Sequence, residues 1–151
     1  MIWHKAYKLE NIKKVMETNM VDHLGIEITA IGPDYLEGTM PVDSRTQQPL
    51  NILHGGASVV LAESLGSIAA NLVLDPNEKL AIGLDVQASH IKSVRNGLVV
   101  GRATAIHIGR KTQVWDIEIT TPSGATVCKS KLSMAVLNKG NKSIGFDGID
   151  A

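Results

Sequence analysis

The stretch of residues 55–74 constrains the fold more strongly than any other part of the sequence. It is rich in Ala, Leu, Val and Ser, it begins directly after His54, and Asp75-Pro76-Asn77 closes it. Such a run predicts one long helix, and Glu63 is the only charged residue within it. A helix that is apolar nearly all round is covered by other structure when it occurs outside a membrane. We therefore expect this helix at the centre of the molecule.

Alternation of apolar and polar residues predicts strands before and after the helix. Residues 24–29 and 35–40 are expected to form a hairpin around Gly32-Pro33-Asp34. Further strands are expected at residues 80–90, 98–108, 113–121 and 127–137. Because Asn96-Gly97 and Ser123-Gly124 are typical hairpin turns, these last four strands should form an antiparallel meander. A short amphipathic helix over 9–20 completes an α+β fold, with an antiparallel sheet wrapped around a central helix.

The composition argues against several classes of partner. With 151 residues the chain corresponds to one domain, and its 15 basic residues balance its 15 acidic ones, so no broad positive field would attract nucleic acid. The single cysteine excludes an internal disulfide, and its place in a predicted strand indicates a small buried side chain. Neither a signal peptide nor a membrane-spanning stretch is evident, so we expect a cytoplasmic protein without a membrane partner.

Two glycines open the central helix and raise the first hypothesis about chemistry. The N-terminus of a helix presents unpaired backbone N–H groups, and a glycine lets a reacting atom approach them closely. The N–H of Gly55 is therefore a candidate donor to an oxyanion. The alternative is that Gly55 and Gly56 only permit tight packing of the helix against the sheet.

Glu63 is the most informative side chain, because a carboxylate in an apolar helix must be paired, exposed or placed at a site. An active-site cleft would explain it, and so would solvent on one exposed face of the helix. Ser67 lies one turn later on the same face. His54 and Glu63 are separated by about 13–14 Å along a helix, which is too far for direct cooperation within one chain. A second subunit would bring them together.

Two segments carry a resemblance to a known family. They are Pro-Val-Asp-Ser-Arg-Thr-Gln-Gln-Pro at 41–49 and Leu-His-Gly-Gly-Ala-Ser-Val-Val-Leu-Ala-Glu-Ser at 53–64, supported by the opening Met-Ile-Trp and by Gln-Val-Trp at 113–115. The chain resembles the hotdog-fold acyl-CoA thioesterases, and among them the 1,4-dihydroxy-2-naphthoyl-CoA hydrolases of menaquinone biosynthesis and the related proofreading thioesterases for aryl carrier proteins. The likeness covers residues 1–138 as one hotdog domain and leaves 139–151 as an expected flexible tail.

The resemblance implies roles for five residues. The backbone N–H of Gly55, with His54 beside it, polarises the thioester carbonyl, and Gln48 contacts the same carbonyl. Glu63 is supplied by the facing subunit as nucleophile or as general base, and Ser67 helps to position water. Such an arrangement supplies donors for the developing oxyanion on one side of the carbonyl and a carboxylate on the other.

The resemblance also implies contacts with coenzyme A. By themselves, the polar and cationic residues of segments 89–95 and 109–111 read as ordinary solvated loop positions. Their places resemble the nucleotide and pantetheine contacts of the family, which singles out five positions. These positions are His90, Ser93, Arg95, Gly109 and Arg110.

The function implied by the resemblance is hydrolysis of an aromatic or polycyclic acyl-CoA to the free acid and CoA. It implies at least a homodimer joined edge to edge, and a homotetramer of two such dimers. Two alternatives stay open at this point: a proofreading thioesterase acting on an acylated carrier protein, and a non-catalytic domain that binds acyl-CoA. No metal or redox cofactor is expected, because His4, His23 and His107 lack the spacing of metal ligands.

Overall fold

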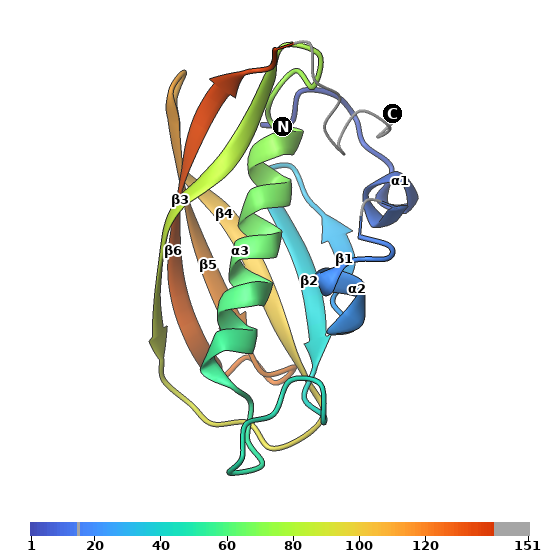
Figure 1. The fold of residues 1–151 in the computed structure, drawn as a ribbon, viewed down its shortest axis with the longest axis vertical. Coiled ribbons are helices and arrows are strands. Elements are labelled where there is room, and N and C mark those ends of the chain that lie inside the picture. Colours follow the sequence, from blue (N-terminus) through green and yellow to red (C-terminus); the bar gives the residue numbers. More distant parts are fainter. Residues whose placement is uncertain (15, 141–151) are drawn as a thin grey trace.

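A computed structural model describes residues 1–14 and 16–140 of the chain (Figure 1). Its elements follow one another as α1 (Leu9–Lys14), α2 (Met20–His23), β1 (Glu27–Ile31), β2 (Tyr35–Pro41), α3 (Gly55–Leu72), β3 (Lys79–His90), β4 (Leu98–Ile108), β5 (Thr112–Thr120) and β6 (Thr126–Asn138). The six strands form one antiparallel sheet, and α3 runs along its inner face. The α+β architecture with a central helix is confirmed.

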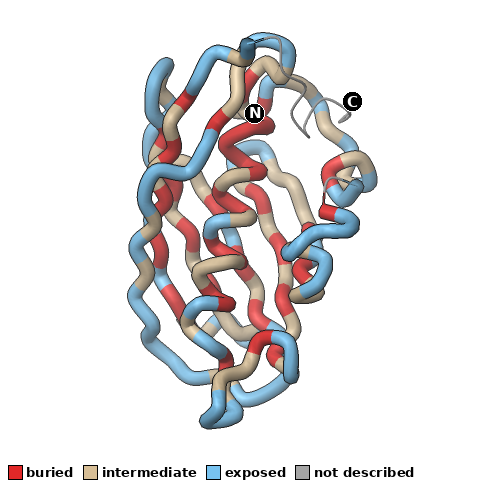
Figure 2. The backbone as a smooth tube through the Cα atoms, viewed as in Figure 1, coloured by how far each residue is buried: buried red, intermediate tan, exposed pale blue. Residues whose placement is uncertain are grey.

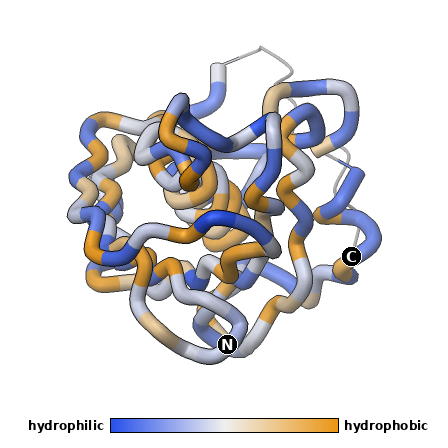
Figure 3. Tube along the Cα trace, turned by 90° about the horizontal axis from the view of Figure 1, so that it is seen from below, coloured by the Kyte–Doolittle hydropathy of each residue, from blue (hydrophilic) through white to orange (hydrophobic). Residues whose placement is uncertain are grey.

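The core lies between α3 and the sheet. Buried positions alternate along β2 and β5, so that one face of each strand meets the helix (Figure 2). Leu61 and Leu65 of α3 are completely buried. Seen from below in Figure 3, the mostly apolar helix lies within the curve of the strands. The apolar stretch of the sequence is therefore covered by the sheet.

The order of the strands differs from the expected meander. The sheet has the order β1-β2-β4-β5-β6-β3, so β3 pairs with β6 at the edge and not with β4. Asn96-Gly97 consequently belongs to a crossover instead of a hairpin, and the Gly97 carbonyl accepts a hydrogen bond from Val42 N–H at 2.8 Å. The hairpin turn at Ser123-Gly124 is confirmed between β5 and β6, with a φ of 87° at Gly124.

The N-terminal region also differs from the prediction of one helix over 9–20. The backbone turns at Thr18, which has a φ of 62°, and Asn19 then caps α2 by accepting a hydrogen bond from Val21 N–H at 3.0 Å. The amphipathic spacing was right for the first helix, because Ile12 is buried. The first helix ends at Lys14, ahead of the turn at Thr18 and the cap at Asn19, and a period of three to four residues does not reveal such a cap.

Strand β3 ends the sheet on one side with a long free edge. It carries two large apolar side chains in solvent, Ile82 at 46% and Leu84 at 62% exposure. Long apolar edges of this kind are sites at which another strand can pair. The first residue of the expected tail is bound to the rest of the chain, because Lys139 N–H donates to Glu78 O at 2.7 Å. Residues 141–151 of the expected tail lie outside the described residues.

No helix among the described residues is long and apolar enough to cross a membrane.

Candidate active site

The first turn of α3 presents one free backbone donor. His54 is the N-cap, and its Nδ1 accepts a hydrogen bond from Gly56 N–H at 2.8 Å. The carbonyl of His54 accepts from Ala57 and Ser58 N–H. Gly55 N–H has no hydrogen-bond partner within the part of the chain that is described. Gly55 is thus the donor left available at this helix terminus.

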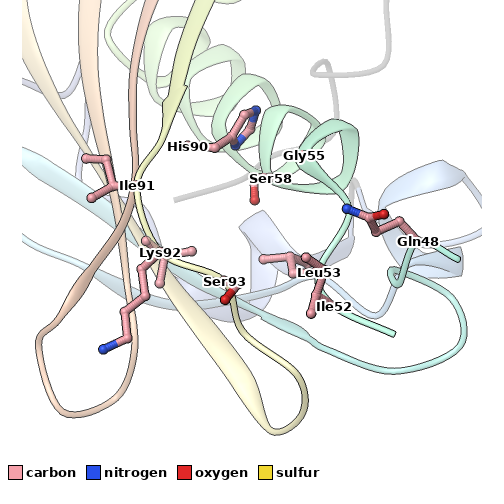
Figure 4. Close-up of a pocket in the computed structure, with 10 residues that line it drawn as sticks. Gln48, Ile52, Leu53, Gly55, Ser58, His90, Ile91, Lys92 and Ser93 are labelled. Atoms are coloured by element: carbon pink, nitrogen blue, oxygen red, sulfur yellow. The ribbon is translucent and has the colours of Figure 1, made fainter. Parts of the chain in front are cut away.

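Gly55 also makes a close contact with the side chain of His90. A Cβ at this position would lie 2.8 Å from Nε2 of His90, the last residue of β3. The two hypotheses for this glycine are therefore compatible, because the absence of a side chain both admits the imidazole and leaves the N–H open. Figure 4 shows His90 beside the start of the helix.

The loop before α3 is held by backbone contacts to its neighbours. His54 N–H donates to Thr46 O at 2.8 Å and Leu53 N–H donates to Val94 O at 2.7 Å. Gln47 turns its side chain to the crossover and donates from Nε2 to Arg95 O at 2.7 Å. The adjacent Gln48 lines the cavity described next. The anchoring role of Gln47 was missed from the sequence, because adjacent glutamines give no sign of which one is free.

An ion pair stiffens the start of the same loop. Arg45 donates from Nε and Nη2 to the two carboxylate oxygens of Asp43, at 3.1 and 2.7 Å. These side-chain hydrogen bonds lower the pKa of Asp43 from 3.8 to about 2. Asp43 N–H in turn donates to Oγ1 of the buried Thr46. The carboxylate of Asp43 therefore stays ionised, and can pair with Arg45, down to a lower pH than an isolated aspartate.

A cavity of about 260 Å³ lies where the loop, the helix N-terminus and the end of β3 meet (Figure 4). Four of the predicted site residues line it: Gln48, Gly55, His90 and Ser93. Ser58 and Lys92 also line it and were missed, since Ser58 looks like an ordinary helix residue in the sequence. The polar groups of this cavity come from segments that are far apart in the chain.

Glu63 and Ser67 lie elsewhere along α3. The carboxylate of Glu63 is exposed and reaches over β3, where a Cβ at Gly83 would lie 2.9 Å from Oε1. The hydroxyl of Ser67 points to the sheet, 3.9 Å from Sδ of Met134. Within one chain, Glu63 is therefore a solvated carboxylate at the sheet edge and is absent from the cavity lining.

The expected CoA contacts are divided in the same way. His90 pairs with Cys128 at one end of the edge strands, and Ser93 lies just beyond it. Gly109 and Arg110 lie at the other end, because the neighbouring Lys111 O accepts a hydrogen bond from Val136 N–H, and Val136 pairs with Ala81 near the start of β3. One chain thus holds each predicted set in two groups, at separate places along β3.

Within residues 1–14 and 16–140, no three side chains of His, Cys, Asp or Glu come together in a way that would hold a metal ion. Cys128 is buried, as its place in a strand predicts.

Relatives of known description match nearly the whole chain. Residues 50–128 match the Thioesterase superfamily. The 1,4-dihydroxy-2-naphthoyl-CoA hydrolase of Escherichia coli is 48% identical over 137 residues, which cover 91% of this chain and 100% of that protein. The proofreading thioesterase EntH of Cronobacter turicensis is 44% identical over 137 residues, which cover 91% and 99% of the two proteins.

Solved structures give the same result for the fold. A thioesterase from Haemophilus influenzae is 48% identical with a TM-score of 0.89, over 91% of this chain and 96% of that one. A mutant thioesterase from Pseudomonas aeruginosa is 43% identical with a TM-score of 0.90, over 92% and 100% of the two chains. The likeness therefore extends far beyond the residues around the cavity.

Proposed function

Because the chain belongs to the hotdog-fold thioesterase superfamily and is a thioester hydrolase, we propose that it hydrolyses an aromatic or polycyclic acyl-CoA of the 1,4-dihydroxy-2-naphthoyl-CoA kind to the free acid and CoA. The 1,4-dihydroxy-2-naphthoyl-CoA hydrolase relative supports the substrate class, and the observation that supports a catalytic site shared by two chains is the division of the site residues into two groups. Gly55 packs against His90 at the end of β3, and Glu63 lies over Gly83, nearer the start of the same strand.

A twofold pairing of β3 with β3 of a second copy would unite the two groups. In an antiparallel pair the end of one strand meets the start of the other. The partner's Glu63 would then face Gly55, and the partner's Gly109 and Arg110 would approach His90 and Ser93. One symmetry operation supplies both missing contacts, and the free edge of β3 with its exposed Leu84 is available for it.

In this arrangement, Gly55 N–H and the Gln48 side chain hold the thioester carbonyl oxygen. Glu63 either takes a proton from a water that adds to the carbonyl carbon, or adds to that carbon itself and forms an anhydride that water then cleaves. In both cases the oxyanion collapses, the C–S bond breaks, and CoA leaves as a thiolate that takes up a proton. The helix N-terminus favours the negative charge that develops on oxygen.

The neighbouring surfaces suit the two parts of such a substrate. A mostly apolar cavity of about 350 Å³ lies on the side of α3 away from His90, and Leu24, Ala57 and Val60 line it together with His54. It is our proposed place for the acyl group. Lys92 lines the first cavity, and Arg95, which is not among the lining residues, follows in the same exposed segment. We propose that these cations meet the phosphates of CoA.

Replacing Glu63 by Gln tests the chemical role of the carboxylate. The change keeps the size of an exposed side chain, so folding and CoA affinity should persist while kcat falls by at least about a hundredfold. Release of thiol from benzoyl-CoA, followed with a thiol reagent, measures kcat, and circular dichroism checks the fold. A rate close to that of the wild type would remove Glu63 from the mechanism.

Mixed dimers test whether the site is shared. Gly55→Ala places a methyl group against His90 and should inactivate the donor half, while Glu63→Gln inactivates the acid half. Mixing the two inactive proteins after dissociation should restore about a quarter of the wild-type turnover, because half of the random dimers carry one intact site out of two. No recovery in dimers shown to be mixed would mean that each chain works alone.

The relative named EntH supports a second candidate, a proofreading thioesterase for an acylated carrier protein. Comparing kcat/KM for an aroyl-CoA and for the same aroyl group on a carrier protein decides between them. Phenylacetyl and straight-chain acyl-CoAs in the same panel define the acyl group. The alternative of a domain that only binds acyl-CoA is set aside, because the named relatives are hydrolases. A role in menaquinone biosynthesis, a cytoplasmic location and a homotetramer of two such dimers stay predictions.

A further inference from the structure

Asn71, in the last turn of α3, ties the helix to the edge of the sheet. Asn71 is buried, and 9% of its surface is exposed. Oδ1 accepts a hydrogen bond from Ala81 N–H at 2.9 Å, and Nδ2 donates to Ala81 O at 3.0 Å and to Ser67 O at 2.9 Å. The carboxamide thus binds both backbone groups of one residue of β3, as a neighbouring strand would.

The two hydrogen bonds between Asn71 and Ala81 show which backbone groups of β3 point away from β6. The N–H and C=O of Ala81 point to Asn71 and therefore away from β6. These directions alternate along a strand, and the bulge between Gly83 and Asp85 shifts the alternation by one residue. Beyond the bulge, Val86, Ala88 and His90 direct their backbone groups to the free edge. The chain then leaves the edge, because Ile91 N–H donates to Val127 O.

We infer that Asn71 is a positioning residue that sets the register of β3 against β3 of a second copy, with Gln87 on the twofold axis. This inference rests on the shared site proposed above. With Ala81 already satisfied by Asn71, the free edge runs from Gly83 to His90. The pairing that uses this whole edge places Val86 opposite the partner's Ala88, and Leu84 opposite the partner's His90.

This register is the one that the shared site needs. His90 packs on Gly55, and the bulge at Leu84 follows Gly83, over which Glu63 lies. Pairing Leu84 with the partner's His90 therefore brings Glu63 to the partner's Gly55. If Ala81 were free, the edge would be longer, and a slip of two residues would move the two chains by about 7 Å along each other. A displacement of that size removes a carboxylate from reach of the carbonyl.

Cysteine cross-linking measures the register directly. In the inferred pairing Gln87 faces its own copy in a non-hydrogen-bonded pair, with Cα atoms about 4.5 Å apart, a distance that a disulfide spans. Ser89→Cys is the matched control, because it lies on the same face of β3 but faces the partner's Asp85, about 14 Å from its own copy. Mild oxidation should link most of the Gln87→Cys protein into dimers and little of the Ser89→Cys protein. The buried Cys128 is common to both variants.

Removing the carboxamide tests Asn71. In the Gln87→Cys background, Asn71→Leu keeps the volume but frees Ala81, and it should lower the yield of disulfide dimer at least about threefold. In the wild-type background, kcat should fall at least about tenfold with KM for the acyl-CoA changed less than about threefold. Asn77→Ala, at an exposed site, is the matched control and should change neither quantity.

Each outcome bears on the inference. Cross-linking of Ser89→Cys as readily as Gln87→Cys would overturn the register, and an unchanged disulfide yield with Asn71→Leu would overturn the role of Asn71. Asn71→Ala, tested in parallel with circular dichroism, serves if the leucine variant does not fold. Thioester hydrolysis by the wild type is measured separately. Normal turnover with the wrong cross-linking pattern would overturn only the register, whereas the expected pattern without hydrolysis of acyl-CoA would overturn only the proposed function.

Discussion

Glu63 shows how much a single side chain reveals in the sequence and what it leaves open. A lone carboxylate in an apolar helix predicts either solvent or a site, and in one chain it is exposed beside Gly83. An exposed position costs no desolvation before a partner arrives. The sequence does not separate the two interpretations, because in the proposed shared site the surface that covers Glu63 belongs to a second copy of the chain.

The pair of Asp43 and Arg45 predicts a pH dependence at low pH. The pKa of Asp43 is lowered from 3.8 to about 2 by its hydrogen bonds with Arg45, so the pair contributes its stabilisation above pH 3.8 and loses it as the pH falls to about 2. An NMR titration of the Asp43 carboxyl should show the low midpoint. Arg45→Gln should return the midpoint towards 3.8. A wild-type midpoint at the ordinary value would contradict the pairing.

The loop residues of the site follow from the sequence only through the family resemblance. Gln48 and Ser93 lie in segments without periodicity, and they meet at the cavity because the backbone of Leu53 binds Val94. Such long-range contacts leave no local pattern. Gly55, in contrast, is a candidate donor from the helix start alone, because it follows the N-cap, and the sequence leaves tight packing as the alternative role.

At the scale of elements, α3 rests on two facing glycines. Gly38 of β2 pairs with Gly101 of β4, and a Cβ at either would lie less than 3 Å from a methyl group of Leu65, at 2.9 and 2.7 Å. The missing side chains let the middle of the helix approach the sheet. A side chain at Gly38 or Gly101 would push α3 away from the sheet and change the position of Glu63 along β3.

Gly101→Ala should therefore destabilise the fold by about 1–3 kcal/mol, as overpacking of a close-packed core does. Urea unfolding measures the change. Combining it with Leu65→Ala, which removes the opposing methyl groups, should cost less than the sum of the two single changes. Additive effects would show that Gly101 and Leu65 do not compete for the same space.

The helices and strands were largely predictable from the sequence, but the order of the strands in the sheet was not. The long helix and the strands follow from apolar periodicity, which is a property of consecutive residues. The position of β3 next to β6 depends on a crossover, and Asn96-Gly97 looks the same in a crossover as in a hairpin. Asn71 was missed for a related reason, because its partner Ala81 lies on another element.

At the scale of the whole molecule, charged side chains on the outer face of the sheet form ion pairs with one another. Glu37, Arg102, Glu118 and Lys129 stand next to one another on four adjacent strands and alternate in sign. Ion pairs at 2.9 and 3.5 Å join the first two and the last two. The edge of β3, in contrast, exposes the apolar side chains of Ile82 and Leu84, which favours association through this edge.

A lysine at the edge should block that association. Leu84→Lys places a charge on the free strand, so the protein should become monomeric at micromolar concentration and lose most of its turnover. Ile106→Lys is the matched control, since Ile106 is 59% exposed and Leu84 is 62% exposed. Sedimentation velocity measures the mass of both variants. A dimeric, active Leu84→Lys protein would exclude the edge of β3 as the interface.

The separation of Gly55 from Glu63 along one helix has a consequence for how the activity responds to the amount of protein. In the proposed shared site, a chain that meets no second chain holds a donor and an acid that do not reach the same carbonyl. Far below the dissociation constant of the dimer, the hydrolysis rate would rise with the square of the total protein concentration. A low concentration of the protein would then be enough to abolish its activity, without any inhibitor.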